Sequence, residues 1–215
     1  RPDGVLLLET QQVDSFISVL EEHDIPCVLA GAPTYRKSIK VVAPDETQAG
    51  YLAAQHLLEL GHRNIVFISD NDEFKYVQDR IYGFTKAMLE SGINISSDWI
   101  YITGFNSKID PEYFSDHSEL TAVIIANEAT SEIVLPHLKL LNKRMPEDIS
   151  VVTFDDFDFA RYHQPTLTAI SYPLYEQGYW ALQMLFNRIR EPTLNHFQLT
   201  FEAKLVKRKS CKALS

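Results

Sequence analysis

The sequence predicts an α/β fold in which mostly parallel strands are covered by helices. Short runs rich in β-branched and aromatic residues alternate with amphipathic helical segments along almost the whole chain, and this alternation is typical of βαβ units. The clearest unit spans residues 45–68, where a helical segment leads through a short turn into a buried strand. No internal repeat or low-complexity tract breaks this order.

The segment 45–68 carries the local signals of a well-defined helix followed by a strand. Asp45 stands at the N-cap position, and Gln48 three residues later completes a capping box. Gly61 lies just past the last apolar residue, where a left-handed C-cap favours glycine. The run 65–68 is too short for a helix and contains only Ile, Val and Phe. The helix has apolar residues three and four apart on one face, namely Ala49, Leu52, Ala53, Leu57 and Leu60.

The other elements follow along the chain in order. Pro136 lies inside a predicted helix and is expected to kink or restart it, because proline removes a backbone donor. Pro173 fits the first position of the last helix, and the chain is expected to be irregular from residue 155 to 165. Apolar residues mark expected helices at 13–20 and at 81–89, the second of which also carries Tyr76 and Arg80. The other expected helices are 111–114, 128–141 and 173–189. The expected strands are 5–8, 27–29, 99–102, 122–126, 150–154, 168–172, 199–201 and 204–206.

Composition and charge narrow the class of protein. The 215 residues are 45% apolar, which is enough for a sizeable core. The net charge of −9 argues against DNA binding by this chain, since phosphate contacts need a basic surface. No apolar run is long enough to span a membrane, and two cysteines form no disulfide framework, which fits a reducing cytoplasm. Because a strand begins almost at Arg1, we expect that a preceding segment has been removed.

Enzyme and metal signatures are missing from the sequence. It contains neither a G-x-G-x-x-G nor a Walker loop nor a G-x-S-x-G turn. Its seven histidines include no pair at i, i+4 and no cysteine at metal spacing. We therefore expect no catalytic residues, no metal and no cofactor.

Several stretches resemble the lactose/galactose-repressor family of transcriptional regulators. The match runs in order from residue 2 to 208. It rests on residues 45–65 (DETQAG to LGHRNI), 80–84 (RIYGF), 146–156 (PEDISVVTFDD), 165–168 (PTLT) and 205–208 (LVKR). The resemblance implies a periplasmic-binding-protein-like domain, with two similar parallel-sheet subdomains joined by three crossovers and a small effector between them.

The resemblance also implies how the chain is divided. Residues 1–63 and 171–191 are expected to form the N-terminal subdomain, and residues 64–170 and 192–215 the C-terminal one. The family's helix-turn-helix, its hinge and its first two βα units have no counterpart here. The first subdomain is therefore expected to be incomplete, and DNA would be bound only through a missing N-terminal segment.

A homodimer is a further expectation, because operators with two half-sites are matched by two-fold symmetric regulators. Phe157, Phe159 and Tyr162 crowd a stretch that is too short and polar to form a core, and exposed aromatic residues of this kind often mark an interface. The alternative is that these rings fold back onto their own subdomain.

Six residues are candidate ligand contacts, since ligands of open α/β sheets bind beyond the carboxyl ends of the strands. The resemblance implies that Arg80, Asn127 and Asp155 touch the effector. An arginine supplies a planar donor, and a carboxylate orients hydroxyl or amine groups. The structural alternatives are a surface ion pair of Arg80 with Asp79 or Asp72, an N-cap for Asn127 and a turn for Asp155.

Asp45, Tyr76 and Phe105 complete this set. Asp45 at a helix N-terminus suits a polar ligand, but it already serves as an N-cap. Tyr76 lies one helical turn before Arg80 on the same face, and Phe105 follows a strand as a possible aromatic wall. For both rings the alternative is packing in the core.

The sequence thus predicts a cytoplasmic, non-catalytic, effector-sensing domain of a bacterial-type transcriptional repressor. The predicted effector is a sugar, with sugar phosphates and purines as alternatives. The competing interpretation is a periplasmic sugar-binding protein that feeds a transporter.

Overall fold

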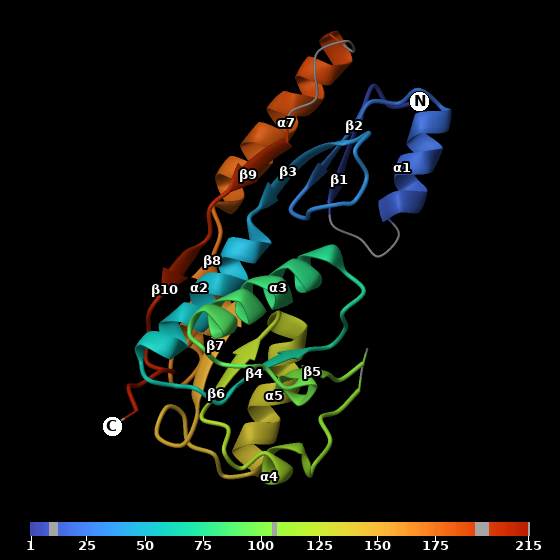
Figure 1. Cartoon of the computed structure of the whole chain (residues 1–215). Coiled ribbons are helices and arrows are strands. Elements are labelled where there is room, and N and C mark those ends of the chain that lie inside the picture. The colour runs from blue at the N-terminus through green and yellow to red at the C-terminus, as the bar shows by residue number, and fades with distance from the viewer. Residues whose placement is uncertain (9–12, 105–106, 192–197, 215) are drawn as a thin grey trace. The chain divides into compact units, whose positions relative to one another are not determined.

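The chain folds into two compact α/β units, shown in Figure 1. The computed structural model describes residues 1–8, 13–104, 107–191 and 198–214. Unit 1 comprises residues 1–45 and 172–202, and unit 2 comprises residues 46–171 and 203–215. The chain passes from one unit to the other three times, after residues 45, 171 and 202. Three crossovers between two parallel-sheet units confirm the predicted fold class.

Unit 1 is built on a four-stranded parallel sheet with the order β1-β2-β3-β9. Alternate residues of β2 point to opposite faces, as the period of a strand requires. Cys27 and Leu29 pack with Ile17 of α1 on one face, whereas Val28 packs with Ala181 of α7 on the other. The elements are β1 (Val5–Leu8), β2 (Cys27–Ala30), β3 (Lys40–Pro44), β9 (Gln198–Phe201), α1 (Val13–Glu22) and α7 (Leu174–Arg190).

Unit 2 contains a six-stranded sheet with the order β10-β8-β7-β6-β4-β5, in which only β10 runs antiparallel to its neighbour. Every residue of β4, β6 and β7 is buried, which is what an apolar run in the centre of a parallel sheet predicts. The strands are β4 (Ile65–Ser69), β5 (Ile100–Ile102), β6 (Ala122–Ile125), β7 (Ser150–Phe154), β8 (Thr168–Ser171) and β10 (Lys204–Val206).

Helices cover both faces of this second sheet. Phe67 of β4 packs against Phe84 of α3, with ring centroids 5.8 Å apart. Its neighbours Val66 and Ile68 belong instead to the core cluster that includes Val134 of α5. The helical elements are α2 (Glu46–Glu59), α3 (Lys75–Glu90), α4 (Tyr113–Asp116), α5 (Glu128–Leu140), α6 (Asp158–Tyr162) and the 3₁₀ turn η1 (Ser97–Trp99).

The helices α2 and α3 approach each other closely through two glycines. A Cβ atom on Gly50 would lie 2.0 Å from the backbone oxygen of Arg80, and a Cβ atom on Gly83 would lie 2.0 Å from the backbone oxygen of Thr47. Any larger residue would force the two backbones apart. This contact places the Arg80 turn of α3 directly against the first turns of α2.

The structure differs from the expected elements at three places. The helix α5 runs through Pro136 without being restarted. The stretch expected to be irregular contains α6, and Phe159 packs against the core of unit 2, whereas Phe157 and Tyr162 are 43% and 76% exposed. The five-residue strand β3 was not among the expected strands, and it is buried between β2 and β9, where pairing is available on both sides.

The unit boundaries also lie elsewhere than the resemblance implied. The helix α2 was expected in the first subdomain, but it packs on α3 and falls within unit 2. The strand β9 was expected in the second subdomain, but it pairs with β3 and falls within unit 1. The strand β3, which pairs with β9, lies far away in the sequence, so the local pattern does not reveal this pairing.

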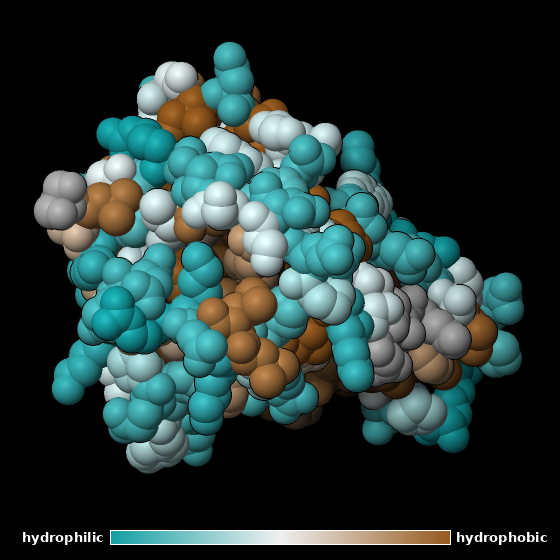
Figure 2. All heavy atoms as spheres, turned by 90° about the horizontal axis from the view of Figure 1, so that it is seen from below, coloured by the Kyte–Doolittle hydropathy of each residue, from teal (hydrophilic) through white to brown (hydrophobic). Residues whose placement is uncertain are grey.

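Among the described residues, no helix combines the length and the apolar character that crossing a lipid bilayer would need. Figure 2 shows that the face seen from below is largely hydrophilic, with a few hydrophobic patches among polar side chains. This surface agrees with the acidic net charge of the chain.

We expect Gly50→Ala and Gly83→Ala each to lower the free energy of unfolding by about 1–3 kcal/mol, because the added methyl group meets backbone atoms that cannot move aside. Urea denaturation measures this change. Gly178→Ala in α7 is the matched control, because its added Cβ atom has nothing within 4 Å. The control should be neutral or stabilising by up to about 1 kcal/mol. Equal effects at all three positions would contradict the close helix contact.

Candidate functional site

Polar side chains gather at the carboxyl edge of the sheet of unit 2. Asp70 and Asn71 follow β4, Asn127 follows β6, Asp155 follows β7, and Arg80 reaches the same edge from α3. The carboxyl ends of neighbouring parallel strands meet at one edge of a sheet, where ligands of open α/β folds bind. We call these five residues the edge cluster.

The guanidinium of Arg80 lies at the centre of this arrangement. Its Nε and Nη2 atoms donate to the two carboxylate oxygens of Glu46 over 2.7 and 2.9 Å, and Nη1 donates to the backbone oxygen of Ala126 over 2.6 Å. The side chains of Arg80 and Glu46 are only 4% and 2% exposed. Arg80 therefore holds α2, α3 and the end of β6 together in a buried, bidentate pair.

Aromatic rings complete the surroundings of this guanidinium. Its central carbon lies 4.3 Å from the ring centroid of Phe154 and 4.8 Å from that of Tyr76. Such cation–π contacts are strongest where water is excluded. Tyr76 also stacks on Phe74, with centroids 5.5 Å apart. The structure thus brings Tyr76 to Arg80, as the spacing predicted, and gives its ring a packing role there.

A surface ion pair of Arg80 with Asp79 or Asp72 was the structural alternative, and the structure instead gives Arg80 a buried partner. Asp79 instead accepts from Lys75 over 2.8 Å, one turn earlier in the same helix. Arg80 is buried and pairs with Glu46, which lies 34 positions before it in the sequence. The sequence patterns did not indicate Glu46 as the partner of Arg80.

Asn127 forms a hydrogen-bonded network with Asp70 and Thr130. Its Oδ1 atom accepts from the backbone N–H of Thr130 over 2.8 Å, so Asn127 caps α5. Its Nδ2 atom donates to Asp70 over 3.0 Å. The Thr130 hydroxyl lies 2.8 Å from Asn127 and 3.3 Å from Asp70. The predicted N-cap role of Asn127 is therefore present, and the same network fixes Asp70 at the edge.

Asp155 has the least common backbone conformation of the edge cluster. Its φ angle is +66°, in the left-handed region that non-glycine residues seldom adopt. Its side chain is 23% exposed, and one carboxylate oxygen lies 4.0 Å from Nη2 of Arg80. The next residue, Asp156, forms ion pairs with Arg208 and Arg161. Of these two neighbouring aspartates, Asp155 is therefore partly exposed at the edge, whereas Asp156 is held in ion pairs that stabilise the fold.

Asn71 adds a buried acceptor that the sequence-based reasoning did not single out. The residue is 5% exposed, and its Oδ1 atom is buried without a hydrogen-bond partner among the residues that the structure describes. A buried acceptor without a partner costs free energy unless a bound group satisfies it. The only available signal was its position two residues beyond a buried strand.

Of the six predicted contacts, Arg80, Asn127 and Asp155 belong to the edge cluster, and Tyr76 contacts it through Arg80. Asp45 precedes α2 but belongs to unit 1, where its backbone N–H donates to Phe201 over 2.8 Å. Phe105 lies outside the described residues.

The formal charges at the edge, with Glu46 included, are one positive against three negative. Arg80 carries the positive charge, and Glu46, Asp70 and Asp155 carry the negative ones. An acidic edge of this kind disfavours anionic ligands.

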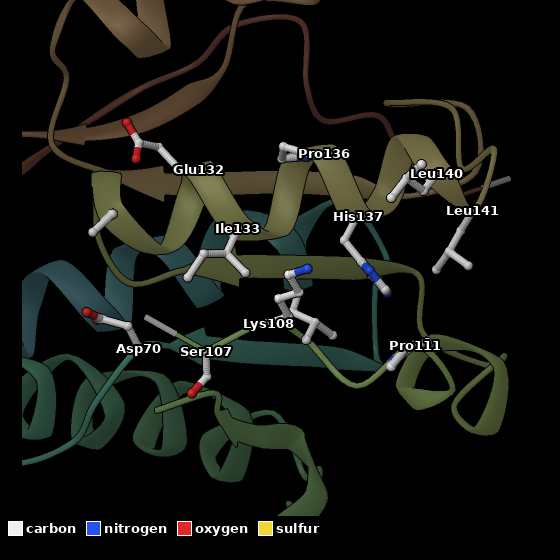
Figure 3. A pocket seen from close by; sticks show the side chains of 12 residues that line it. Asp70, Ser107, Lys108, Pro111, Glu132, Ile133, Pro136, His137, Leu140 and Leu141 are labelled. Atoms are coloured by element: carbon white, nitrogen blue, oxygen red, sulfur yellow. The ribbon is translucent and has the colours of Figure 1, made fainter. Parts of the chain in front are cut away.

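A hollow of about 890 Å³ lies beside the edge cluster, between α5 and the segment 107–111. Figure 3 shows Asp70 at one end of it and His137, Leu140 and Leu141 at the other. Most of its walls are apolar, and Asp70 links it to the edge cluster. In the described part of the chain, no three His, Cys, Asp or Glu side chains are grouped as metal ligands.

The architecture of this chain is shared with known proteins. A family model described as "Periplasmic binding protein-like domain" matches residues 54–211. The chain belongs to this family. The HTH-type transcriptional repressor PurR of Vibrio vulnificus (strain CMCP6) is 30% identical over 221 residues, which cover the whole chain and 66% of that repressor. PurR of Photobacterium profundum is 29% identical with the same coverage.

Among solved structures, the "transcriptional regulator CelR-cellobiose complex" is similar to this periplasmic-binding-protein-like chain. Its TM-score is 0.87 at 28% identity, over 97% of this chain and 65% of CelR. The resemblance to the lactose/galactose-repressor regulators is thereby confirmed. The chain spans about two thirds of the length of these relatives.

We expect Arg80→Ala to lower the free energy of unfolding by about 3–5 kcal/mol, because it leaves the carboxylate of Glu46 buried without its partner. Asp79→Ala is the matched control on the same helix, where the partly exposed pair with Lys75 contributes less than about 1 kcal/mol. Urea denaturation compares the two variants. The double variant Arg80→Met/Glu46→Leu should be more stable than Arg80→Ala, and a more severe loss would refute the ion-pair explanation.

Proposed function

We propose that this chain is the effector-sensing part of a transcriptional repressor and that its effector is a neutral, hydroxyl-rich molecule of the sugar class. The observation that carries this proposal is the edge cluster, which places carboxylate and amide acceptors at the carboxyl edge of a parallel sheet. The similarity to repressors and to a regulator in complex with cellobiose supports it.

The chemistry of the edge cluster favours a neutral sugar over the other two candidates. Asp155 and the Oδ1 atom of Asn71 are acceptors, and hydroxyl groups are donors that match them. A sugar phosphate would bring negative charge to an edge that already carries a formal excess of negative charge. A purine would need a flat apolar slot, but the ring of Tyr76 is already packed against Arg80 and Phe74.

In the whole regulator we propose that the effector changes DNA affinity in the cytoplasm without any catalysis. That change can be no larger than the difference in effector affinity between the two states of the protein. A homodimer would match the two half-sites of an operator. A periplasmic transport protein is the weaker candidate, because the curated relatives quoted above are repressors.

A thermal-shift screen tests the ligand class. We expect cellobiose or ribose to raise the melting temperature at millimolar concentration, and ribose 5-phosphate and hypoxanthine to leave it unchanged, because ligand binding stabilises only the folded state. A shift with hypoxanthine alone would overturn the sugar class and retain the sensing role. No shift across a wide panel of sugars and purines would count against the sensing role itself.

We expect Asp155→Gly to reduce affinity for the sugar found in that screen at least about tenfold, because a charged hydrogen bond to the ligand is lost. Glycine accepts the positive φ angle of this position, so the free energy of unfolding should change by less than about 1 kcal/mol. Isothermal titration calorimetry measures the affinity. Asp156→Asn is the adjacent control, and it should weaken folding through Arg208 while leaving affinity unchanged. The reverse pattern would show that Asp155 is only a turn residue.

A further inference from the structure

The guanidinium of Arg80 binds an anion that belongs to the chain itself. A planar guanidinium recognises a carboxylate through two parallel N–H donors, and arginine binds acidic ligands with the same geometry. Here the two donors Nε and Nη2 are directed at the two oxygens of Glu46, over 2.7 and 2.9 Å. The position that an acidic ligand would take at Arg80 is therefore occupied by Glu46.

The occupied guanidinium lies at the edge where a ligand is expected. Nη1 of Arg80 donates to the backbone oxygen of Ala126, which directly precedes Asn127 of the edge cluster. Nη2 lies 4.0 Å from a carboxylate oxygen of Asp155, whose side chain is 23% exposed. A ligand held by Asp155 would thus lie close to the guanidinium. An acidic group on that ligand would have to compete with Glu46 for the same two donors.

Glu46 has the advantage in this competition. It belongs to the same folded chain, so its contact with Arg80 needs no loss of the translational freedom that a free ligand must give up. Its carboxylate also neutralises the one cation of the edge cluster, and Asp70 and Asp155 then leave the edge with a negative excess. The edge therefore offers an acidic ligand neither the two donors nor a favourable charge.

We propose that Glu46 determines the class of ligand that this edge accepts: it occupies the anion-binding position at Arg80 and so restricts the edge to neutral ligands. The part of this proposal that concerns ligand class rests on the proposed function, in which the effector binds at this edge. The occupied position itself is independent of the effector. Arg80 then supports a neutral effector by holding the edge together, while Asp155 and Asn71 contact it.

Chemical rescue with acetate tests the occupied position. Glu46→Ala removes the heavy atoms that make up acetate, and it leaves a space beside a guanidinium whose side chain is only 4% exposed. Engineered cavities take up small molecules that match them. We expect acetate to raise the melting temperature of this variant by about 3 °C or more above the effect of sodium chloride at the same ionic strength. The wild-type chain should not distinguish the two salts.

Two further variants serve as controls. Glu46→Gln removes the same charge but keeps the space filled, and Glu46→Ala/Arg80→Met keeps the space but removes the guanidinium, so neither should respond to acetate. Trimethylamine N-oxide in every sample keeps destabilised variants folded. If Glu46→Ala is nevertheless unfolded in chloride, recovery of its circular dichroism in acetate is the same positive result. No preference of Glu46→Ala for acetate, or an equal preference in Glu46→Gln, refutes the occupied position.

Glucuronate tests the ligand class, because it is a sugar that carries a carboxylate. We expect glucuronate to raise the melting temperature of Glu46→Ala but not that of the wild-type chain, and acetate to compete with it. A response to acetate without one to glucuronate overturns the role of Glu46 in ligand class. If instead neutral sugars leave the wild-type chain unchanged while acetate still stabilises Glu46→Ala, the sugar proposal fails and the occupied position stands.

Discussion

The buried pair of Arg80 and Glu46 is the interaction on which the edge of unit 2 depends. One guanidinium binds both oxygens of a carboxylate on α2, the backbone at the end of β6 and the faces of two aromatic rings. It therefore joins two helices to the strand ends that carry the polar cluster. A charge so completely enclosed is tolerable only with such geometry, because desolvation of an unpaired ion is costly. The position of Asp155 relative to this charge follows from the same contacts.

This pair can form only because α2 and α3 lie unusually close together. Gly50 and Gly83 let each helix backbone touch the other, and the contact on Gly50 is made with the backbone of Arg80 itself. The short distance brings the first turn of α2, with Glu46, within reach of the guanidinium. The two glycines and the ion pair therefore depend on each other, because the close backbone contact between α2 and α3 brings Glu46 and Arg80 within bonding distance.

Sequence patterns predicted those features of the site that depend on neighbouring residues in the chain. The apolar runs indicated β4, β6 and β7, and the residues that follow them lie at one edge, as parallel strands require. The patterns did not predict Glu46 as a partner of Arg80, since an acid in the first turn of a helix is ordinarily exposed. The resemblance implied that α2 and β9 belong to the opposite subdomains from those in which the structure places them, and the strand that pairs with β9 is distant in sequence. Pro136 failed to interrupt α5 because its helix is held against the core on its buried side.

The hydrogen bonds of the edge cluster separate residues that hold the site from residues that can respond to a ligand. Asn127 uses its acceptor on the N-terminus of α5 and a donor on Asp70, so its orientation is fixed by the fold. Arg80 is held by Glu46 and by backbone in the same way. Capacity for a new donor is greatest at the partly exposed carboxylate of Asp155 and at the buried side-chain oxygen of Asn71. Specificity at this edge would then come from acceptors alone, which is why hydroxyl groups suit it better than phosphate groups.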